Sequence, residues 1–271
     1  MGLSVVMPAH NEEAYLAAAV RTVVDGLRAR AWTFDVIVCE NGSTDATAAL
    51  ADGLAEAEPE VRALHLPAAD YGAALRSGFR AATGDIVANV DVDLVDLAFL
   101  DRAAAVLAER PTVAVVVGTK RGAGAVDERS LLRRAVTGGF AAVMRHGFGL
   151  RASDTHGLKM LRRDVLGPVV DACTSASEIF DTELVLRAER AGLEVAELPL
   201  RVAEQRPART PITSRIPRTL VGLARLRRAL WLEAVPGYSP SGRRSSTRKL
   251  PRPAPSSSTQ RPDASASQYS S

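Results

Sequence analysis

The sequence of 271 residues has few aromatic side chains, two cysteines and no long apolar run. Aromatic residues make up 4% of the chain, which argues against a protein that binds nucleic acid by stacking bases on aromatic rings. Cys39 and Cys173 are too few for a disulfide framework and lack the spacing of a zinc site. The longest uncharged, mainly apolar run covers ten residues, 135–144, whereas about 20 are needed to cross a bilayer. We therefore expect no transmembrane helix.

Several catalytic fingerprints are also missing. No G-x-G-x-x-G motif follows the first apolar run, and no G-x-x-x-x-G-K-[ST] motif occurs, which argues against a nicotinamide enzyme and a P-loop NTPase. The G-x-S-x-G motif of α/β-hydrolases is absent too. The chain begins without a basic region and an apolar signal core, so we expect a cytoplasmic protein.

Positive charge is unevenly distributed. Lysine occurs only at positions 120, 159 and 249, so arginine supplies most of the net charge of +3. Residues 237–271 carry a net charge of +5, which leaves the rest of the chain at −2. This Ser/Pro-rich segment has almost no large apolar residues, and we expect it to be disordered. The body of the protein is thus not a basic nucleic-acid binder.

Strands alternate with helices over the first 119 residues. Apolar runs predict five strands, at residues 3–8, 34–40, 61–67, 85–91 and 112–118, and the segments between them have helical spacing. This alternation predicts an α/β fold with a mostly parallel sheet and helices on both faces. Farther along we expect helices over 127–146 and 180–192 and strands over 157–162 and 193–202.

Three polar clusters follow the predicted first, second and fourth strands. In open parallel sheets, ligands bind beyond the carboxyl ends of the strands, so these clusters are expected to form one site. The sharpest cluster is Asp91-Val92-Asp93, whose two carboxylates can share a hard divalent cation such as Mg²⁺ or Mn²⁺. Such a metal would bridge a diphosphate, although two exposed acids at the start of a loop would have the same sequence.

The other two clusters are "PAHNEE" at 8–13 and "ENGSTDAT" at 40–47. Each could be part of a binding site or only the start of a capped helix. Asn11 would cap the first following helix, and Ser43 or Thr44 would cap the second. Asn41-Gly42 suits a turn with a positive φ. Capping leaves Glu40 unexplained, and its carboxylate could accept hydrogen bonds from a nucleobase or ribose.

Taken together, the segments "SVVMPAHNEE", "VIVCENGSTDAT", "YGAALRSGFRAATGDIVANVDVDL" and "GTKRG" resemble the inverting GT-A glycosyltransferases in order and spacing. Farther along, "SDTHGLKMLRRDV" and "IFDTELVLRAERAGLEVAELPLRV" are similar to the polyprenyl-phosphate group, which includes the dolichyl-phosphate mannosyl- and glucosyltransferases. The resemblance extends to about residue 202. It implies a GT-A fold and transfer of a hexose, with inversion, from a nucleotide sugar to a polyprenyl phosphate.

The resemblance also assigns roles to matching positions. Asp91 and Asp93 match the D-x-D motif that holds metal and diphosphate. Glu40 is one methylene longer than the usual Asp, so the donor base stays open. The residues implied in nucleotide-sugar binding are Pro8, Ala9, Glu12, Glu40, Asn41, Gly72, Asp91, Val92 and Asp93.

The acceptor decides the rest of the mechanism. A lipid monophosphate is already an anion, so positioning and charge neutralisation would suffice, with Lys120, Arg133 and Arg134 as candidate phosphate ligands. The two arginines could equally form a solvated helix face. An alcohol acceptor would need a base, for which Asp181 is the first candidate, unless it is an ordinary acid at a helix start. Asp154 and Lys159 could form a structural ion pair.

The sequence divides into three predicted segments: a GT-A domain over 1–215, a basic amphipathic helix over 216–236 and the tail over 237–271. The helix would either lie on the inner face of the plasma membrane or pack on the body through its leucines. Two alternatives to a polyprenyl-phosphate enzyme remain: an enzyme with a soluble small-molecule acceptor, and a non-catalytic module that binds sugar nucleotides.

Overall fold

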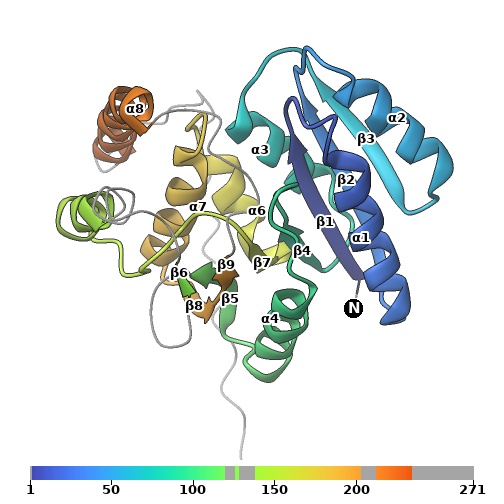
Figure 1. Cartoon of the computed structure of the whole chain (residues 1–271). Coiled ribbons are helices and arrows are strands. Elements are labelled where there is room, and N and C mark those ends of the chain that lie inside the picture. Colours follow the sequence, from blue (N-terminus) through green and yellow to red (C-terminus); the bar gives the residue numbers. More distant parts are fainter. Residues whose placement is uncertain (1, 120–125, 128–137, 203–211, 234–271) are drawn as a thin grey trace, which may run out of the picture. The chain divides into compact units, whose positions relative to one another are not determined.

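The computed structural model describes residues 2–119, 126–127, 138–202 and 212–233 (Figure 1). Residues up to Trp231 form one compact unit, and Leu232–Ser271 form the second. Among the described helices, none combines the length and the apolarity needed to span a bilayer. The predicted boundaries at residues 215 and 236 stay predictions.

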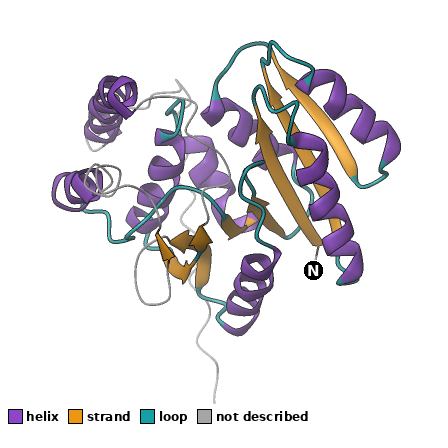
Figure 2. Ribbon diagram, in the orientation of Figure 1, coloured by secondary structure: helices purple, strands orange, loops and turns teal. Residues whose placement is uncertain are grey.

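A seven-stranded sheet forms the centre of the first unit, with the order β3-β2-β1-β4-β7-β5-β8 (Figure 2). Its strands are β1 (Gly2–Ala9), β2 (Thr33–Asn41), β3 (Val61–Leu66), β4 (Ile86–Asn89), β5 (Val113–Thr119), β7 (Lys159–Arg162) and β8 (Glu194–Pro199). All neighbours are parallel except β7, which runs antiparallel to both β4 and β5. The predicted α/β fold is therefore confirmed.

Helices cover both faces of this sheet. The helices are α1 (Leu16–Ala29), α2 (Thr47–Ala57), α3 (Tyr71–Ala81), α4 (Leu97–Glu109), α6 (Arg163–Ala172), α7 (Ile179–Arg190) and α8 (Ile212–Glu233). Side chains alternate between the faces: Val5 and Met7 of β1 pack in the core under α1, α2 and α4, whereas Val6 packs under α3, α6, α7 and α8. Both faces of the central strands are thus buried, as their continuous apolar runs predict.

Some predicted elements differ from those observed. The predicted strand over 193–202 is divided into β8 and β9 (Arg201–Val202), and β9 pairs in parallel with β6 (Val126–Asp127). The predicted helix over 127–146 falls partly outside the described residues; residues 138–143 are helical and continue as a π-helix, η1 (Met144–Phe148). Helix α6 was not predicted.

The C-terminal helix α8 packs on the body through one row of leucines. Leu223, Leu226 and Leu230 are buried in the core beside α7, whereas Leu220 and Trp231 are exposed. Packing against the body therefore accounts for three of the leucines of this helix.

Candidate active site

The polar clusters meet at the carboxyl-terminal edge of the sheet. Pro8 and Ala9 end β1, and Glu40 and Asn41 end β2. The parallel register aligns Ala9 with Glu40, and Glu40 with His65 of β3. The strand ends thus bring residues from three separate segments side by side. The sequence predicts that the first two of these segments meet, whereas His65 carries no prediction.

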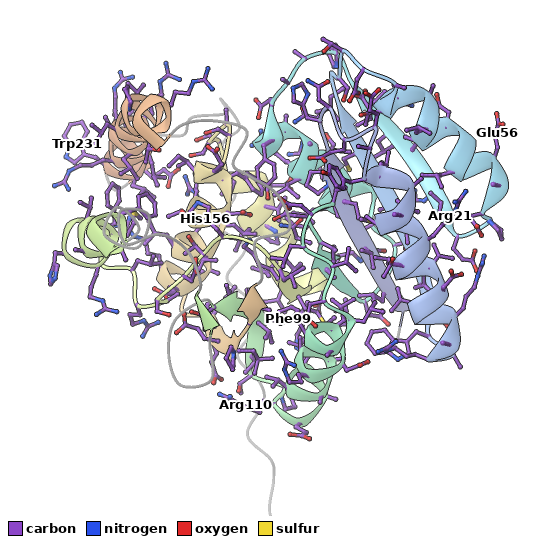
Figure 3. The ribbon with its side chains drawn as sticks, viewed as in Figure 1. Arg21, Glu56, Phe99, Arg110, His156 and Trp231 are labelled. Carbon is purple, nitrogen blue, oxygen red and sulfur yellow. The ribbon has the colours of Figure 1, made fainter. Side chains whose placement is uncertain are left out.

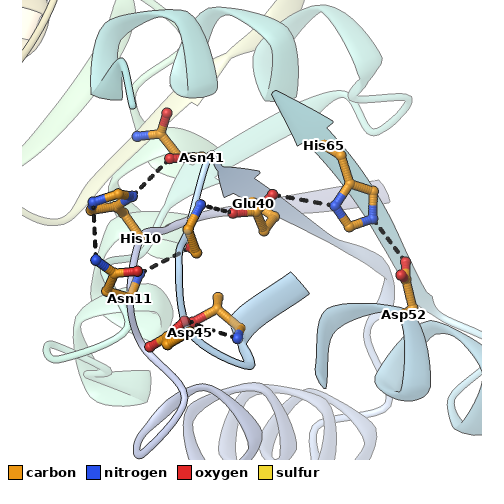
Figure 4. Close-up of polar contacts among 9 residues, drawn as sticks. His10, Asn11, Glu40, Asn41, Asp45, Asp52 and His65 are labelled. Atoms are coloured by element: carbon orange, nitrogen blue, oxygen red, sulfur yellow. Dashed lines mark hydrogen bonds and ion pairs between the residues drawn. The ribbon is translucent and has the colours of Figure 1, made fainter. Parts of the chain in front are cut away.

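The loops after β1 and β2 are joined by hydrogen bonds in both directions (Figure 4). Asn11 accepts a bond from the Thr44 N–H at 2.8 Å, and its own N–H donates to Ser43 Oγ at 3.0 Å. The N–H of Glu12, a buried residue, donates to Thr47 Oγ1 at 2.7 Å. These contacts hold the two loops in one arrangement.

This arrangement corrects the predicted helix caps. Helix α1 begins at Leu16, well after Asn11, and α2 begins at Thr47 with Ala46 at the N-cap position. Asn11 adopts a left-handed backbone with φ of 54°, so that it bonds across to the second loop rather than capping its own helix. Gly42 has the positive φ, 60°, that the sequence predicts.

Glu40 is buried and held on both sides. One carboxylate oxygen accepts the Ser43 N–H at 2.5 Å, and the other lies 3.3 Å from His65 Nδ1. Burial alone would raise the pKa of Glu40, but the bonds from Ser43 and His65 outweigh it and lower the pKa below its ordinary value. His65 also contacts Asp52 at 2.8 Å. The contacts with Asp52 and Glu40 raise the pKa of the imidazole, because together they outweigh burial, which lowers it.

The start of α3 connects this cluster to the rest of the site. Asn41 Oδ1 accepts the Asp70 N–H at 2.6 Å, and Asp70 caps α3 by accepting the Ala73 N–H. Gly72 lies in the first turn, where an added Cβ would come within 2.3 Å of the Ser175 carbonyl oxygen. Only a glycine at this position lets α3 pack so closely on the segment before α7.

Tyr71 lies between two carboxylates that come from distant parts of the sequence. Its hydroxyl is 3.2 Å from Asp91 Oδ1, beyond the end of β4, and 3.2 Å from Asp181 Oδ2, in the first turn of α7. Burial, followed by the charges of Asp181 and Asp91, raises the pKa of Tyr71 well above its ordinary value, so this hydroxyl keeps its proton. One proton serves one carboxylate at a time.

Asp181 also pairs with Lys159, whose side chain is fully buried on β7. The Lys159 ammonium lies 2.9 Å from Asp181 Oδ1 and donates to the Gly157 carbonyl oxygen at 2.8 Å. The predicted pair of Lys159 with Asp154 is therefore wrong. Asp154 instead accepts the backbone N–H groups of Thr155 and His156.

Asp91 and Asp93 present only oxygen donors near the end of β4, with Val92 buried between them. Burial, followed by the nearby charge of Asp181, raises the pKa of Asp91 to about 6. The charge of Asp93 also raises this pKa, whereas the charge of Lys159 lowers it. Within the described residues, no group of three or more His, Cys, Asp or Glu side chains could hold a metal ion. Carboxylate oxygens are the donors that hard divalent cations prefer, so the chemistry of this pair fits such a cation.

Three predicted residues, Lys120, Arg133 and Arg134, lie outside the described residues. Two residues of the site, Tyr71 and Lys159, carry no prediction as binding or catalytic residues. Each had a sequence signal: Tyr71 precedes Gly72 at a helix start, and Lys159 is one of only three lysines and interrupts an apolar strand.

Comparison with known proteins adds a family match. The model of the family described as glycosyl transferase family 2 matches residues 4–169. Glycosyltransferase AglD of Haloferax volcanii is 32% identical over 214 residues, which cover 73% of this chain and 32% of the relative. Dolichyl-phosphate beta-glucosyltransferase ALG5A of Trichomonas vaginalis is 25% identical over 210 residues, which cover 73% and 64%. The chain thus spans less than two thirds of either relative.

A solved structure has a similar fold. Glucosyl-3-phosphoglycerate synthase from Mycobacterium tuberculosis, in complex with Mn²⁺, UDP and glucosyl-3-phosphoglycerate, superimposes with a TM-score of 0.61. The two are 23% identical, and the match covers 84% of this chain and 79% of that one. The likeness shows that the architecture is of the GT-A type.

Proposed function

The chain belongs to glycosyl transferase family 2, and from this we propose that it transfers a hexose from a nucleotide sugar to a polyprenyl phosphate, with inversion at the anomeric carbon. The observation that carries the proposal is the meeting of Asp91 and Asp181 at the Tyr71 hydroxyl, at the edge of the sheet where Glu40 and Asn41 also lie. The name of the dolichyl-phosphate relative supports a lipid-linked acceptor.

The donor would bind along the ends of β1, β2 and β4. Glu40 and Asn41 would contact the nucleoside. Pro8, Ala9 and Glu12 would form the adjacent wall of the donor site. Gly72 would allow α3 to lie close to the donor. Asn41 already bonds to Asp70, and Glu40 already bonds to Ser43, so these side chains are oriented before any ligand binds. Orientation in advance reduces the entropy lost on binding.

Asp91 and Asp93 would hold Mg²⁺ or Mn²⁺ together with the donor diphosphate. The raised pKa of Asp91 supports this role, because burial of one carboxylate near two others is unfavourable without a cation. A bound cation would neutralise the charge that develops on the departing nucleoside diphosphate.

The arrangement around Asp181 favours a phosphate acceptor over an alcohol. Its Oδ1 lies 2.9 Å from the Lys159 ammonium as an ion pair, although no hydrogen bond from the described residues reaches this oxygen, and its Oδ2 accepts a hydrogen bond from Tyr71. An alcohol would have to displace one of these two residues to reach a base, whereas a phosphate oxygen is already a nucleophile. In the proposed step, the phosphate oxygen forms a bond to the anomeric carbon while the bond from that carbon to the diphosphate breaks.

Lys120, Arg133 and Arg134 remain the proposed cations for the acceptor phosphate, since paired N–H donors and fixed charge suit phosphate oxygens. A lipid-linked acceptor would bring the enzyme to a membrane surface, and the inner face of the plasma membrane is the proposed location.

The test is release of nucleoside diphosphate from UDP-, GDP- and dTDP-sugars with Mg²⁺ or Mn²⁺, with and without a short polyprenyl phosphate. Release that requires the lipid phosphate, and that falls by about 100-fold or more in Asp91→Asn and Asp93→Asn, is the expected result. Asp25→Asn, at an exposed position on α1, is the matched control and should retain activity.

Other outcomes would contradict the proposal in distinct ways. Metal-dependent release without the lipid would indicate a soluble acceptor. Nucleotide binding without release from any donor would favour a non-catalytic binding module.

A further inference from the structure

Exposed apolar side chains of large size gather around α8. Within the described part of the chain there are five, and four of them are Val143 (48% exposed), Leu220 (60%), Val221 (50%) and Trp231 (66%). Val143 directly precedes η1, which contacts α8 because the Arg227 guanidinium donates to the Gly147 carbonyl oxygen at 3.1 Å. Four of the five large exposed apolar side chains among the described residues therefore lie on or near α8.

Three of these side chains, with Ala224, form one stripe that we name the outer face of α8. At 100° per residue, Leu220, Ala224 and Trp231 fall within about 40° of one another, and Val221 lies beyond them. The buried Leu223, Leu226 and Leu230 lie on another side of the helix. Figure 3 shows Trp231 projecting outward from α8.

Arginines flank the outer face. Arg218 and Arg225 are exposed on one side of the stripe, and Arg227 is exposed on the other. Arg228, also exposed, falls about 80° from Leu220 and so lies between Ala224 and Val221. Across the exposed positions of α8 from 217 to 233, the one acidic residue is Glu233. An apolar stripe between arginines is the pattern of a helix that lies in the interface of an anionic bilayer.

From this charge pattern we infer that the outer face of α8 binds the surface of an anionic membrane, with Leu220 and Trp231 entering the boundary between headgroups and acyl chains. Residues 237–271 carry a net charge of +5, so their charge opposes docking on this basic face. A second copy would likewise bring arginines against arginines. Anionic lipid complements both the apolar stripe and its basic margins.

The inference also connects this surface with the candidate site. Gly222 of α8 packs on Ile179, because an added Cβ there would lie 2.9 Å from the Ile179 side chain. Ile179 begins α7, and Asp181 lies two residues farther along the same turn. A membrane bound to the outer face would thus be one helix away from the site. Membrane binding itself does not depend on the proposed transferase activity and is measured separately.

The experiment uses the full chain with Trp32→Phe, so that Trp231 is the single tryptophan. Emission and acrylamide quenching of Trp231 are recorded with vesicles of phosphatidylcholine alone and with vesicles of equal parts phosphatidylcholine and phosphatidylglycerol. We expect a blue shift and protection with the anionic vesicles, which weaken as salt is raised.

Two pairs of variants then separate this face from the basic tail in vesicle sedimentation. Arg225→Glu is expected to weaken binding by about tenfold, whereas Arg21→Glu, the same charge change on α1, should alter it less than about threefold. Leu220→Ser is expected to weaken it several-fold, and Tyr15→Ser, the control at the fifth exposed apolar residue, should not. Circular dichroism melting checks that each variant folds.

Three results would overturn the inference. The first is no binding to anionic vesicles. The second is binding without any change in Trp231 emission and with equal losses in Arg225→Glu and Arg21→Glu, which would indicate that the tail binds the vesicles. The third is protection of Trp231 in the absence of vesicles that increases with protein concentration, which would indicate that a second copy covers this face. Loss of vesicle binding with full transfer to a water-soluble acceptor analogue would leave the proposed function intact.

Discussion

Lys159 and Asp181 form an ion pair of 2.9 Å in which neither side chain exceeds 3% exposure. The pair joins β7 to the first turn of α7, and through Tyr71 it reaches Asp91. Because a buried charge without a partner is costly, each member of the pair fixes the other.

Removal of Lys159 alone should therefore destabilise the protein strongly. We expect Lys159→Met to lower the free energy of unfolding by about 3–5 kcal/mol, because it leaves the buried Asp181 without its cation. Urea denaturation measures the change. Arg80→Met, which breaks the exposed pair with Asp171, is the control and should cost less than about 1 kcal/mol.

The double variant Lys159→Met/Asp181→Leu is the decisive comparison for the same pair. It should recover most of the lost stability, because neither member of the pair is then left as a buried charge without its partner. A double variant as unstable as the single one would mean that packing of the lysine stem, and not the charge, is what matters.

Two glycines in helices should respond to alanine in opposite directions. Gly72→Ala is expected to cost about 1–3 kcal/mol, because its Cβ would meet the Ser175 carbonyl oxygen at 2.3 Å. Gly53→Ala, on the exposed side of α2 with nothing within 4 Å, should stabilise by about 0.4–1 kcal/mol through the unfolded state. Thermal melting of both variants checks the signs; stabilisation by Gly72→Ala would refute the close approach of α3.

His65 should make stability depend on pH. The pKa of the folded-state imidazole is raised above its ordinary value of 6.5, so the stabilisation is fully present below pH 6.5 and is lost as pH rises through the raised value. Compared with His65→Gln, the native chain should gain stability at pH 5.5 and lose that gain in alkaline buffer. The gain should stay under about 1 kcal/mol, because the imidazole is 42% exposed.

Urea titrations at several pH values measure this difference. His146→Gln, at an exposed position in η1, is the control for loss of a histidine elsewhere. A gain that grows toward alkaline pH would reverse the sign and contradict the contacts of His65 with Asp52 and Glu40.

Strands β1, β4 and β5 and most of β2 were predictable because both of their faces are buried, so the sequence shows nearly unbroken apolar runs. Strand β3 lies at the edge of the sheet, and its Arg62 and His65 are exposed. The confirmed α/β class follows from the alternation of strands with helices. Helix α6 escaped prediction because Gly167 and Pro168 interrupt its pattern. The antiparallel insertion of β7 between β4 and β5 has no local signature, since it depends on which strands meet in space.

The candidate site was predictable to the extent that its residues follow strand ends. Tyr71 and Lys159 each had a weak sequence signal, but their place in the site is visible only in the fold, because their partners lie far along the chain. The predicted caps Asn11, Ser43 and Thr44 failed for a related reason: their side chains and N–H groups satisfy one another across two loops. Sequence preferences for N-cap residues consider hydrogen bonds within one helix start only, so they do not predict bonds between two loops.

The exchange between the loops after β1 and β2 has a consequence for the engineering of this domain. Asn11, Glu12 and Glu13 take or supply hydrogen bonds that residues 43–47 complete. Transplanting either loop alone from a relative would leave buried donors, such as the Glu12 N–H, without acceptors. The two loops are therefore best redesigned as one unit, and a chimera that alters donor preference should exchange both together.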